Sequence, residues 1–498
     1  MAVVVALDAG TTGVRAFAVD EAGQPAGFRY QEFTQHFPRP GWVEHDPTEI
    51  WEAVVTTTTQ LIASLEQPVA ALGITNQRES VVVWDRRTGR PLHRALVWQD
   101  RRTAQRCEAL EAAGHLPLVR DRTGLVLDPY FSASKLEWLL TEGGVEVGPN
   151  LAFGTVDAWL VWNLTGGEVH ATEASNASRT MLFDIRRLEW SGELCDLFSV
   201  PPSCLPEVHP SSGRLGVTVA SSGLPPGLPI SGVAGDQQAA LFGQACFEPG
   251  MTKNTYGTGS FVLMNVGTRC PEPVEGLLTT VAWTVPDSSS ETARRTDYAL
   301  EGAIFSTGSA VQWLRDGLGI IDEAAEVGPL AESCPDTEGV YLVPAFTGLG
   351  SPWWDPYARG AIVGITRGTS RAHLARAVVE AMAFQTRDAI DAMAAHSGLG
   401  VTALRADGGA SVMDLLLQLQ ADQLQAPVAR PRIQETTALG AAYLAGLAEG
   451  VWSSLDEVTA NWVLDVEKCP AVPASTADAS HAQWNRAVER CRDWARER

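Results

Sequence analysis

Two short stretches rich in glycine and threonine carry the clearest chemical signal in the sequence. One is "AGTTG" at 9–13, and the other is "YGTGSF" at 256–261. Glycines let backbone N–H groups approach an anion closely, and threonine hydroxyls add donors, so such a turn can hold phosphate oxygens. A single turn of this kind is also consistent with an ordinary β-turn. Two of them, one in each half of the chain, predict a nucleotide held across a cleft.

The first turn contains no lysine to offset the charge of a phosphate. Asp8 precedes it at the end of an apolar run, and Arg15 follows it. A carboxylate beside a phosphate is repelled unless a magnesium ion lies between them. Backbone N–H groups, hydroxyls, Arg15 and Mg²⁺ would then balance the phosphate. The sequence contains no GxxxxGK[ST] and no GxGxxG, which disfavours P-loop and Rossmann sites.

Polar residues that follow apolar segments form a second group of candidates. Arg78 and Glu79 stand side by side after "ITNQ", and a donor next to an acceptor suits the hydroxyls of a polyol; a surface ion pair is the alternative. Asp236 stands between an expected strand and an expected helix, where it could act as a general base, a metal ligand or a plain N-cap. Tyr130 and Trp98 could line a substrate pocket or serve packing alone.

Other patterns narrow the chemistry. The segment "LRADGG" at 404–409 reads as a strand and a tight turn, against which a flat ring or ribose could pack, or which could have no ligand. The nine histidines include no HxxxH or HExxH spacing, and the eight cysteines include no CxxC pair. Zinc sites and metal-dependent hydrolysis are therefore disfavoured, and the cysteines are typical of reduced thiols.

The elements that must position these residues occur in the same order twice. "VVVAL", "VRAFAVD" and "AGFRYQEFTQ" predict an antiparallel meander, followed by a helix capped by Asp46 with Pro47 at its first position. Near residue 245 the pattern restarts as strand, Gly-Thr turn and strand, and a long helix is expected over 370–396. We predict a duplicated α/β fold, with domains at 1–245 and 246–498 and a hinge near 246–253.

Composition excludes some classes of protein. The chain has 498 residues, of which 45% are hydrophobic, so about two to four domains with a large core are expected. Its formal net charge of −22 disfavours nucleic acid and anionic lipid as partners. No stretch approaches the roughly 20 apolar residues of a membrane span, and the N-terminus lacks the pattern of a signal peptide. We expect a cytoplasmic protein without membrane insertion.

Taken together and in order, these motifs resemble the glycerol kinases of the FGGY family of carbohydrate kinases, in the actin/hexokinase/Hsp70 superfamily. The resemblance runs nearly end to end, and its most specific stretches are "GITNQRE", "TGLVLDPYFS", "GDQQAALFGQ", "KNTYGTG" and "VPAFTGLGSPWWDPYARG". It implies two RNase-H-like ATPase domains around a central cleft and phosphorylation of glycerol to sn-glycerol 3-phosphate with ATP and Mg²⁺. A homodimer or homotetramer is implied as well.

The resemblance also implies a role for each residue that matches a family motif. Asp236 would be the general base, and Asp8 with Asp236 would surround the magnesium. Glycerol would be held by Arg78, Glu79, Trp98, Tyr130, Asp236, Gln237 and Phe261. The phosphates would contact Thr11, Thr12, Gly13, Arg15, Thr258 and Gly259. The adenosine side would be lined by Gly308, Gln312, Gly409 and Met413.

The chain departs from the family pattern at a few positions. Met413 stands where many members have an asparagine near the adenosine, which leaves that contact open, and Ala9 stands where many have glutamine. The loop "SSGLPPG" at 221–227 lacks the Gly/Arg-rich sequence with which some members bind fructose 1,6-bisphosphate, and the histidine that some use as a phosphorylation site is absent. Neither form of control is expected.

Two alternatives to a glycerol-phosphorylating enzyme stay open from the sequence. One is a sister kinase of the same family that acts on another polyol or a ketose. The other is a non-catalytic nucleotide-switch protein of the actin/Hsp70 type. The second alternative keeps both Gly-Thr turns but has no use for Arg78, Glu79 and Asp236 together, so their joint presence favours an enzyme.

Overall fold

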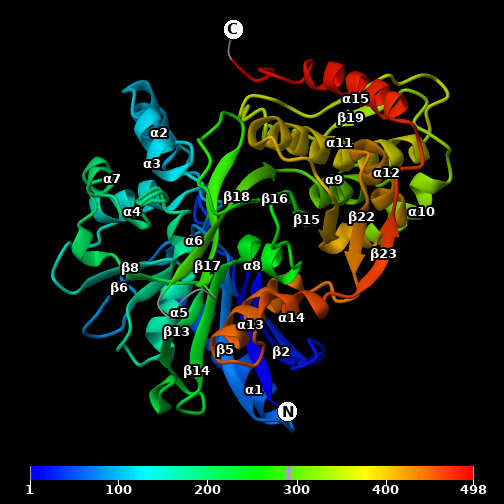
Figure 1. Ribbon diagram of the computed structural model, residues 1–498. Helices are drawn as coiled ribbons and strands as arrows, with labels where there is room; N and C mark the ends of the chain where they lie inside the picture. Colours follow the sequence, from blue (N-terminus) through cyan, green and yellow to red (C-terminus); the bar gives the residue numbers. More distant parts are fainter. Residues whose placement is uncertain (1, 288–292, 497–498) are drawn as a thin grey trace.

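Two mixed β-sheets organise the molecule (Figure 1), in a computed structural model that describes residues 2–287 and 293–496. The first sheet has the spatial order β13-β14-β5-β1-β2-β3. Its strands are β1 (Val3–Ala9), β2 (Gly13–Asp20), β3 (Pro25–Glu32), β5 (Val69–Asn76), β13 (Ser212–Val217) and β14 (Pro229–Gly235). Strands β1, β2 and β3 form the predicted antiparallel meander, and β5 runs parallel to β1 on its other side.

The second sheet repeats this arrangement with the spatial order β17-β18-β16-β15-β21-β22-β23. Its strands are β15 (Thr252–Tyr256), β16 (Ser260–Gly267), β17 (Leu278–Pro286), β18 (Arg294–Ile304), β21 (Leu404–Asp407), β22 (Val428–Pro431) and β23 (Leu464–Lys468). Strands β15 and β16 form an antiparallel hairpin, and β21 runs parallel to β15 as β5 does to β1. The duplicated α/β architecture is confirmed.

Helices and short strands cover and connect the two sheets. The helices are α1 (Pro47–Ser64), α2 (Ala104–Ala112), α3 (Leu116–Thr123), α4 (Ser132–Thr141), α5 (Val156–Leu164), α6 (Ala174–Ala177), α7 (Gly192–Leu197), α8 (Asp236–Gly243), α9 (Gly308–Gln312), α10 (Val327–Glu332), α11 (Arg371–Ser397), α12 (Asp414–Leu424), α13 (Thr436–Ala448), α14 (Leu455–Ala460) and α15 (Ala474–Val488). The short strands are β4 (Glu44–His45), β6 (Val82–Asp85), β7 (Ala95–Leu96), β8 (Leu151–Gly154), β9 (Ala171–Glu173), β10 (Phe183–Asp184), β11 (Glu189–Trp190), β12 (Glu207–His209), β19 (Tyr341–Val343) and β20 (Ala361–Val363).

Local sequence signals explain where the main helices begin. Asp46 caps α1 by accepting a hydrogen bond of 2.8 Å from the backbone N–H of Thr48, and Pro47 is the first helical residue. Glu49 does not return to the cap; its carboxylate accepts from the N–H of Thr34 at 2.9 Å and so fastens the helix to the segment after β3. The long helix expected over 370–396 is observed as α11.

A helix from the second half packs against the first sheet. Helix α13 lies across β14, β5 and β1 and against α8, as Figure 1 shows in its lower part. Glycines allow the two helix backbones to touch: a Cβ on Gly440 would lie 1.8 Å from the carbonyl oxygen of Ala239, and one on Gly243 would lie 1.9 Å from that of Thr436. This contact fixes α8, and Asp236 is the first residue of α8.

The apolar cores and the cysteines agree with the expectations from composition. Separate apolar clusters fill the interior beneath each sheet. All eight cysteines are free thiols, and Cys469 is exposed. In residues 2–287 and 293–496, no helix is both long enough and apolar enough to cross a bilayer.

Candidate active site

A cavity of about 180 Å³ lies between the two Gly-Thr turns. It is lined by Thr11 of the first turn and by Gly257, Thr258 and Gly259 of the second, together with Thr255. Its other lining residues are the seven predicted to hold the polyol: Arg78, Glu79, Trp98, Tyr130, Asp236, Gln237 and Phe261. Residues separated by up to 250 positions in the sequence, Thr11 and Phe261, therefore meet at one site, as the sequence predicts.

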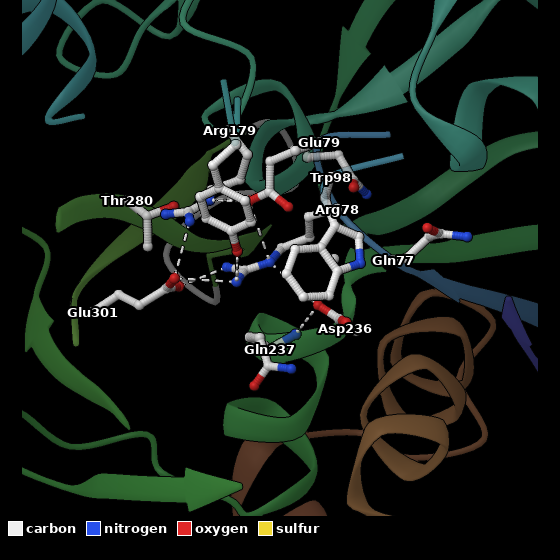
Figure 2. A network of polar contacts seen from close by, with 12 residues as sticks. Gln77, Arg78, Glu79, Trp98, Arg179, Asp236, Gln237, Thr280 and Glu301 are labelled. Carbon is white, nitrogen blue, oxygen red and sulfur yellow. Dashed lines mark hydrogen bonds and ion pairs between the residues drawn. The ribbon is translucent and has the colours of Figure 1, made fainter. Parts of the chain in front are cut away.

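Arg78 is the centre of the polar part of this cavity. Its side chain is 1% exposed, and its two terminal nitrogens donate to the carboxylate of Glu301 at 2.6 and 3.1 Å. Its Nε lies 3.2 Å from a carboxylate oxygen of Asp236, and its Nη2 donates to the hydroxyl of Tyr130 at 3.4 Å. Figure 2 shows the Arg78 guanidinium between Glu301 and Asp236. Arg78 and Glu79 are therefore buried, and the surface ion pair considered above does not occur.

Arg179 closes a ring of alternating charges with Arg78, Glu79 and Glu301. Its Nε donates to Glu79 at 2.7 Å, and its Nη2 donates to Glu301 at 2.9 Å. Burial alone would raise the pKa of Glu301, but the guanidiniums of Arg179 and Arg78 lower it to about 2. The ring is charged and almost without exposed surface, so it holds Arg78 and Glu79 in place before any substrate binds.

Glu79 has an uncommon backbone conformation. Its φ is 62°, in the left-handed region that side chains other than glycine rarely adopt. The residue follows β5, and its carboxylate lines the cavity while Arg179 holds it from behind. Strain of this kind concentrates at functional sites, where surrounding contacts maintain it.

Asp236 combines the contacts of a helix start with access to the cavity. Gly235, not Asp236, is the N-cap of α8. The Asp236 carboxylate accepts a hydrogen bond of 2.7 Å from the N–H of Gln237, and its side chain is 29% exposed. Burial raises the pKa of Asp236, whereas Arg78 and Lys253 lower it. A carboxylate with a raised pKa that opens into a cavity is suited to accept a proton.

Asp8 lies at the end of β1, where burial raises its pKa to about 7, Arg15 lowers it and Asp236 adds to the rise. In the described part of the chain, no hydrogen-bond donor reaches its carboxylate, and no group of three or more His, Cys, Asp or Glu residues forms a metal cage. Two carboxylates that disfavour each other's charge suit Mg²⁺, which binds through one or two carboxylates plus substrate phosphates. The residues therefore fit the ion.

The first Gly-Thr turn connects β1 and β2. The N–H of Gly10 donates to the carbonyl of Gly13 at 3.0 Å, which closes the turn. The hydroxyl of Thr11 accepts from the indole of Trp98 at 3.0 Å, and that of Thr12 lies 3.4 Å from the hydroxyl of Tyr30. Arg15 lies on β2 and forms an ion pair with Glu435, which a phosphate would have to share or displace.

The second turn is hydrogen-bonded to a segment that is predicted to line the adenosine. The N–H of Gly308 donates to the carbonyl of Gly257 at 3.0 Å, and the N–H of Ser309 donates to that of Thr258 at 3.0 Å. On the other side, a Cβ on Gly408 would lie 2.6 Å from the carbonyl oxygen of Tyr256. The start of α9 and the Asp-Gly-Gly turn therefore flank the second turn.

The predicted adenosine-side residues make fewer contacts than the polyol residues. Gln312 and Gly409 are exposed, and a Cβ on Gly409 would meet nothing within 4 Å. Met413 is half-buried and packs against the apolar core of the second half, with its Sδ 3.6 Å from where a Cβ of Gly328 would lie. The cavity that contains the polyol residues is not lined by Gly308, Gln312, Gly409 or Met413.

Sequence reasoning missed Arg179 and Glu301. Each is the one charged residue within a segment that is otherwise uncharged, "NASRTMLF" at 176–183 and "YALEGAIF" at 298–305. Charged residues are almost never fully buried unless they are paired, so a lone charge in such a segment is a usable signal. The sequence did not reveal that the two residues pair with Arg78 and Glu79.

Two family profiles match most of the chain. The N-terminal domain of the FGGY family of carbohydrate kinases matches residues 3–243, and the C-terminal domain of that family matches residues 252–449. The chain is 53% identical over 500 residues to the glycerol kinase of Bordetella parapertussis, covering 99% of this chain and 98% of that one. It is 54% identical to the glycerol kinase of Symbiobacterium thermophilum, covering 99% of each.

Solved structures agree with these matches. Plasmodium falciparum glycerol kinase with ADP has a TM-score of 0.91 and 34% identity, covering 99% of this chain and 98% of that chain. Gluconate kinase from Lactobacillus acidophilus has a TM-score of 0.88 and 21% identity, covering 98% of each chain. At the lower identity the likeness is one of fold alone.

Proposed function

Because the chain belongs to the FGGY family of carbohydrate kinases, we propose that it transfers the γ-phosphoryl group of ATP to glycerol and forms sn-glycerol 3-phosphate. The observation that carries this proposal is the cavity in which Arg78, Glu79 and Asp236 meet beside both Gly-Thr turns. It offers a fixed donor, a fixed acceptor and a base at one place. The relatives named glycerol kinase, which match nearly the whole chain, support glycerol as the substrate.

The polyol is held by groups that are already in place. Arg78 donates and Glu79 accepts, so the pair suits two neighbouring hydroxyls of glycerol. The rings of Trp98 and Tyr130, whose centroids lie 5.7 Å apart, form an apolar wall for the carbon chain. A substrate that lacks one hydroxyl leaves a buried charged group without its partner, and this is how such a site rejects it.

Asp236 is placed to accept the proton of the reacting hydroxyl. Its carboxylate is held at the start of α8 by Arg78 and by its own helix, and it faces the cavity between the two turns. The hydroxyl oxygen then attacks the γ-phosphorus in line, the bond between that phosphorus and the β,γ-bridging oxygen breaks, and ADP leaves. Because phosphoryl transfer needs positioning and charge balance more than covalent help, these fixed groups account for most of what the protein must supply.

The phosphates lie against the two turns. Backbone N–H groups and the hydroxyls of Thr11, Thr12 and Thr258 donate to phosphate oxygens, with Gly13, Gly259 and Arg15 beside them. Asp8 and Asp236 would hold Mg²⁺, and the bound ion would neutralise negative charge on the phosphates. The adenosine side then lies along Gly308, Gln312, Gly409 and Met413.

The test is ADP release by the purified protein with ATP and Mg²⁺, with glycerol and, separately, with dihydroxyacetone, erythritol and xylulose. Release that depends on glycerol and is weak with the others supports the proposal. Turnover with another polyol or ketose alone would favour a sister kinase and overturn the assignment of Arg78 and Glu79. ATP binding without turnover on any substrate would favour a nucleotide switch.

Three further properties form part of the proposal. We place the protein in the cytoplasm as a homodimer or homotetramer, and we divide it into domains at 1–245 and 246–498. The family profiles, which change from one domain to the other between residues 243 and 252, support that division. Sedimentation of the purified protein measures its oligomeric state, and a monomer at all concentrations would contradict this part.

A further inference from the structure

Lys253 is a buried cation to which neither the sequence analysis nor the proposed mechanism gave a role. It is one of three lysines in the chain and lies on β15 with 0% of its surface exposed. Its ammonium donates to the side-chain oxygen of Gln237 at 2.5 Å and to the hydroxyl of Thr255 at 2.9 Å. Within the described residues, no carboxylate oxygen lies at ion-pair distance from it. Burying an ammonium without a carboxylate is costly, which points to a use for its charge.

Both acceptors of Lys253 line the cavity. Gln237 is on α8 directly after Asp236, and Thr255 is two residues before the Gly-Thr-Gly turn. Lys253 and Thr255 are separated by one residue on a strand, so they point to the same face of the second sheet. The ammonium therefore lies beneath the cavity, between the residue that contacts the polyol and the strand that leads to the second phosphate turn.

The two hydrogen bonds fix which atoms face the substrates. An ammonium can only donate, so it must face the oxygen of the Gln237 amide, and the amide nitrogen is left for another partner. The same argument applies to Thr255: its oxygen accepts from Lys253, and its hydrogen is free to be donated elsewhere. Gln237 then offers a donor to a polyol oxygen, and Thr255 offers a donor to a phosphate oxygen.

Charge balance gives Lys253 a second effect. The ring around the polyol contains the cations Arg78 and Arg179 and the anions Glu79 and Glu301, so Asp236 adds one uncompensated negative charge. Lys253 is near enough to lower the pKa of Asp236. The pKa of Lys253 itself is lowered to about 8, mainly by burial. The carboxylates of Asp407, Glu301 and Asp236 raise it and so keep it from falling further. ATP brings further negative charge into this neighbourhood.

We propose that Lys253 is a positioning residue for phosphoryl transfer. It turns the amide N–H of Gln237 toward the polyol and the hydroxyl of Thr255 toward the transferred phosphoryl group, and its charge stabilises the negative charge that gathers between Asp236 and the phosphates. The first Gly-Thr turn has no lysine, and Lys253, on the strand that leads to the second turn, provides the positive charge instead. This inference rests on the proposed function, because it assigns Lys253 to the same cavity.

Substitutions at Lys253 and Thr255 test the proposal in the full-length protein with ATP, Mg²⁺ and glycerol. Lys253→Met keeps an unbranched side chain one atom shorter and removes the charge and the donors. Lys468→Met is the matched control, because Lys468 pairs with Asp414 at a half-exposed surface. Removing a preorganised donor at such a site costs on the order of 100-fold in turnover, which we expect for Lys253→Met. Lys468→Met should match the wild type.

A double-mutant cycle separates positioning from a general structural role. Because Lys253 acts through the hydroxyl of Thr255, the variant Lys253→Met/Thr255→Val should lose little more than the worse single variant. The melting temperature of Lys253→Met should lie well above the assay temperature, so that unfolding does not explain the lost turnover. Losses that multiply across the cycle, or wild-type kinetics in Lys253→Met, would overturn the proposal.

Thr255 keeps the proposal testable if Lys253→Met does not fold. Thr255→Ser retains the hydroxyl and should keep turnover within a few-fold of the wild type, whereas Thr255→Val should lose it by on the order of 100-fold. Equal turnover in these two variants would contradict the role given to the hydroxyl. A failure of the proposed function is distinct, because it would show in the wild type as no release of ADP with glycerol.

Discussion

The two ends of the cleft are built in different ways. At the polyol end, four charged side chains with almost no exposed surface form a closed ring, and Arg78 also contacts Asp236, Tyr130 and Gln238, which lie outside that ring. At the adenosine end, Gln312 and Gly409 are exposed. Because the ring is already formed before substrate binds, little binding free energy is lost in ordering its side chains. We therefore expect the polyol end to set the selectivity for substrates. We therefore expect the nucleotide itself to complete the end of the cleft where Gln312 and Gly409 are proposed to line the adenosine.

The largest expected effect follows from removing the base at the junction of the two ends. Asp236→Asn keeps the shape of the side chain and removes its ability to take a proton, so turnover should fall by about 10²–10⁴-fold. KM for ATP should change much less. Steady-state release of ADP measures both constants, and the melting temperature confirms that the variant is folded. Unchanged turnover would refute a base at Asp236.

Substitution in the charged ring at the polyol end should destabilise the protein far more than substitution in the ion pair between Arg15 and Glu435, beside the first Gly-Thr turn. Glu301→Gln leaves Arg78 and Arg179 without their shared carboxylate, so the free energy of unfolding should fall by about 3–5 kcal/mol. Glu435→Gln removes the partner of Arg15, but Glu435 is 44% exposed, so the cost should stay within about 1 kcal/mol. Denaturant unfolding compares the two, and equal losses would remove the contrast between the ends.

The same pair of variants should separate in substrate binding. Glu301→Gln should raise KM for glycerol by about tenfold or more, because a displaced hydrogen bond to a charged group costs about 1.5–3 kcal/mol. Glu435→Gln should leave that KM unchanged and act, if at all, on KM for ATP. A rise in KM for glycerol in Glu435→Gln alone would show that the ring does not set polyol binding.

Acid should weaken the contribution of Glu301. Its pKa is lowered from an ordinary value of 4.5 to about 2 on folding, so its contribution to stability is complete above about 4.5 and is lost as the pH falls toward 2. The difference in unfolding free energy between the wild type and Glu301→Gln should therefore shrink from pH 5 to pH 3. A difference that stays constant or grows would mean that Glu301 is not ionised in the folded protein.

The sequence predicts the local parts of this site better than the long-range ones. The Gly-Thr turns, the meander and the start of α8 depend on neighbouring residues, and each was identified from a few positions. The seven polyol residues came from the family resemblance, residue by residue, and all of them line one cavity. Glu301 contacts Arg78 across 223 positions, and no local pattern encodes such a pair.

The sequence also did not predict the backbone contact between α8 and α13, which lie far apart in the chain. The glycines at which α8 and α13 touch, Gly243 and Gly440, each look like tolerated helical glycines in the sequence. Only the folded chain shows that a side chain there would overlap the backbone of the other helix. The position of Asp236 thus depends on a helix that begins 200 residues later, at Thr436, and on a contact between two backbones.

The smallest expected effect lies at the adenosine end. Met413 is half-buried and packs against the core, and a thioether is at best a weak hydrogen-bond acceptor. Met413→Asn supplies an amide, and one added hydrogen bond is worth about 0.5–1.5 kcal/mol, so KM for ATP should fall by about 2- to 10-fold. KM for glycerol should not move, because Met413 lies outside the cavity that holds the polyol residues. Initial rates at varied ATP and at varied glycerol separate the two constants.

Met413→Leu, which keeps the packing and adds no amide, is the matched control and should leave both unchanged. If Met413→Asn and Met413→Leu raise KM for ATP equally, Met413 serves the core rather than the nucleotide, and the adenosine end depends still more on backbone contacts at Gly308 and Gly409.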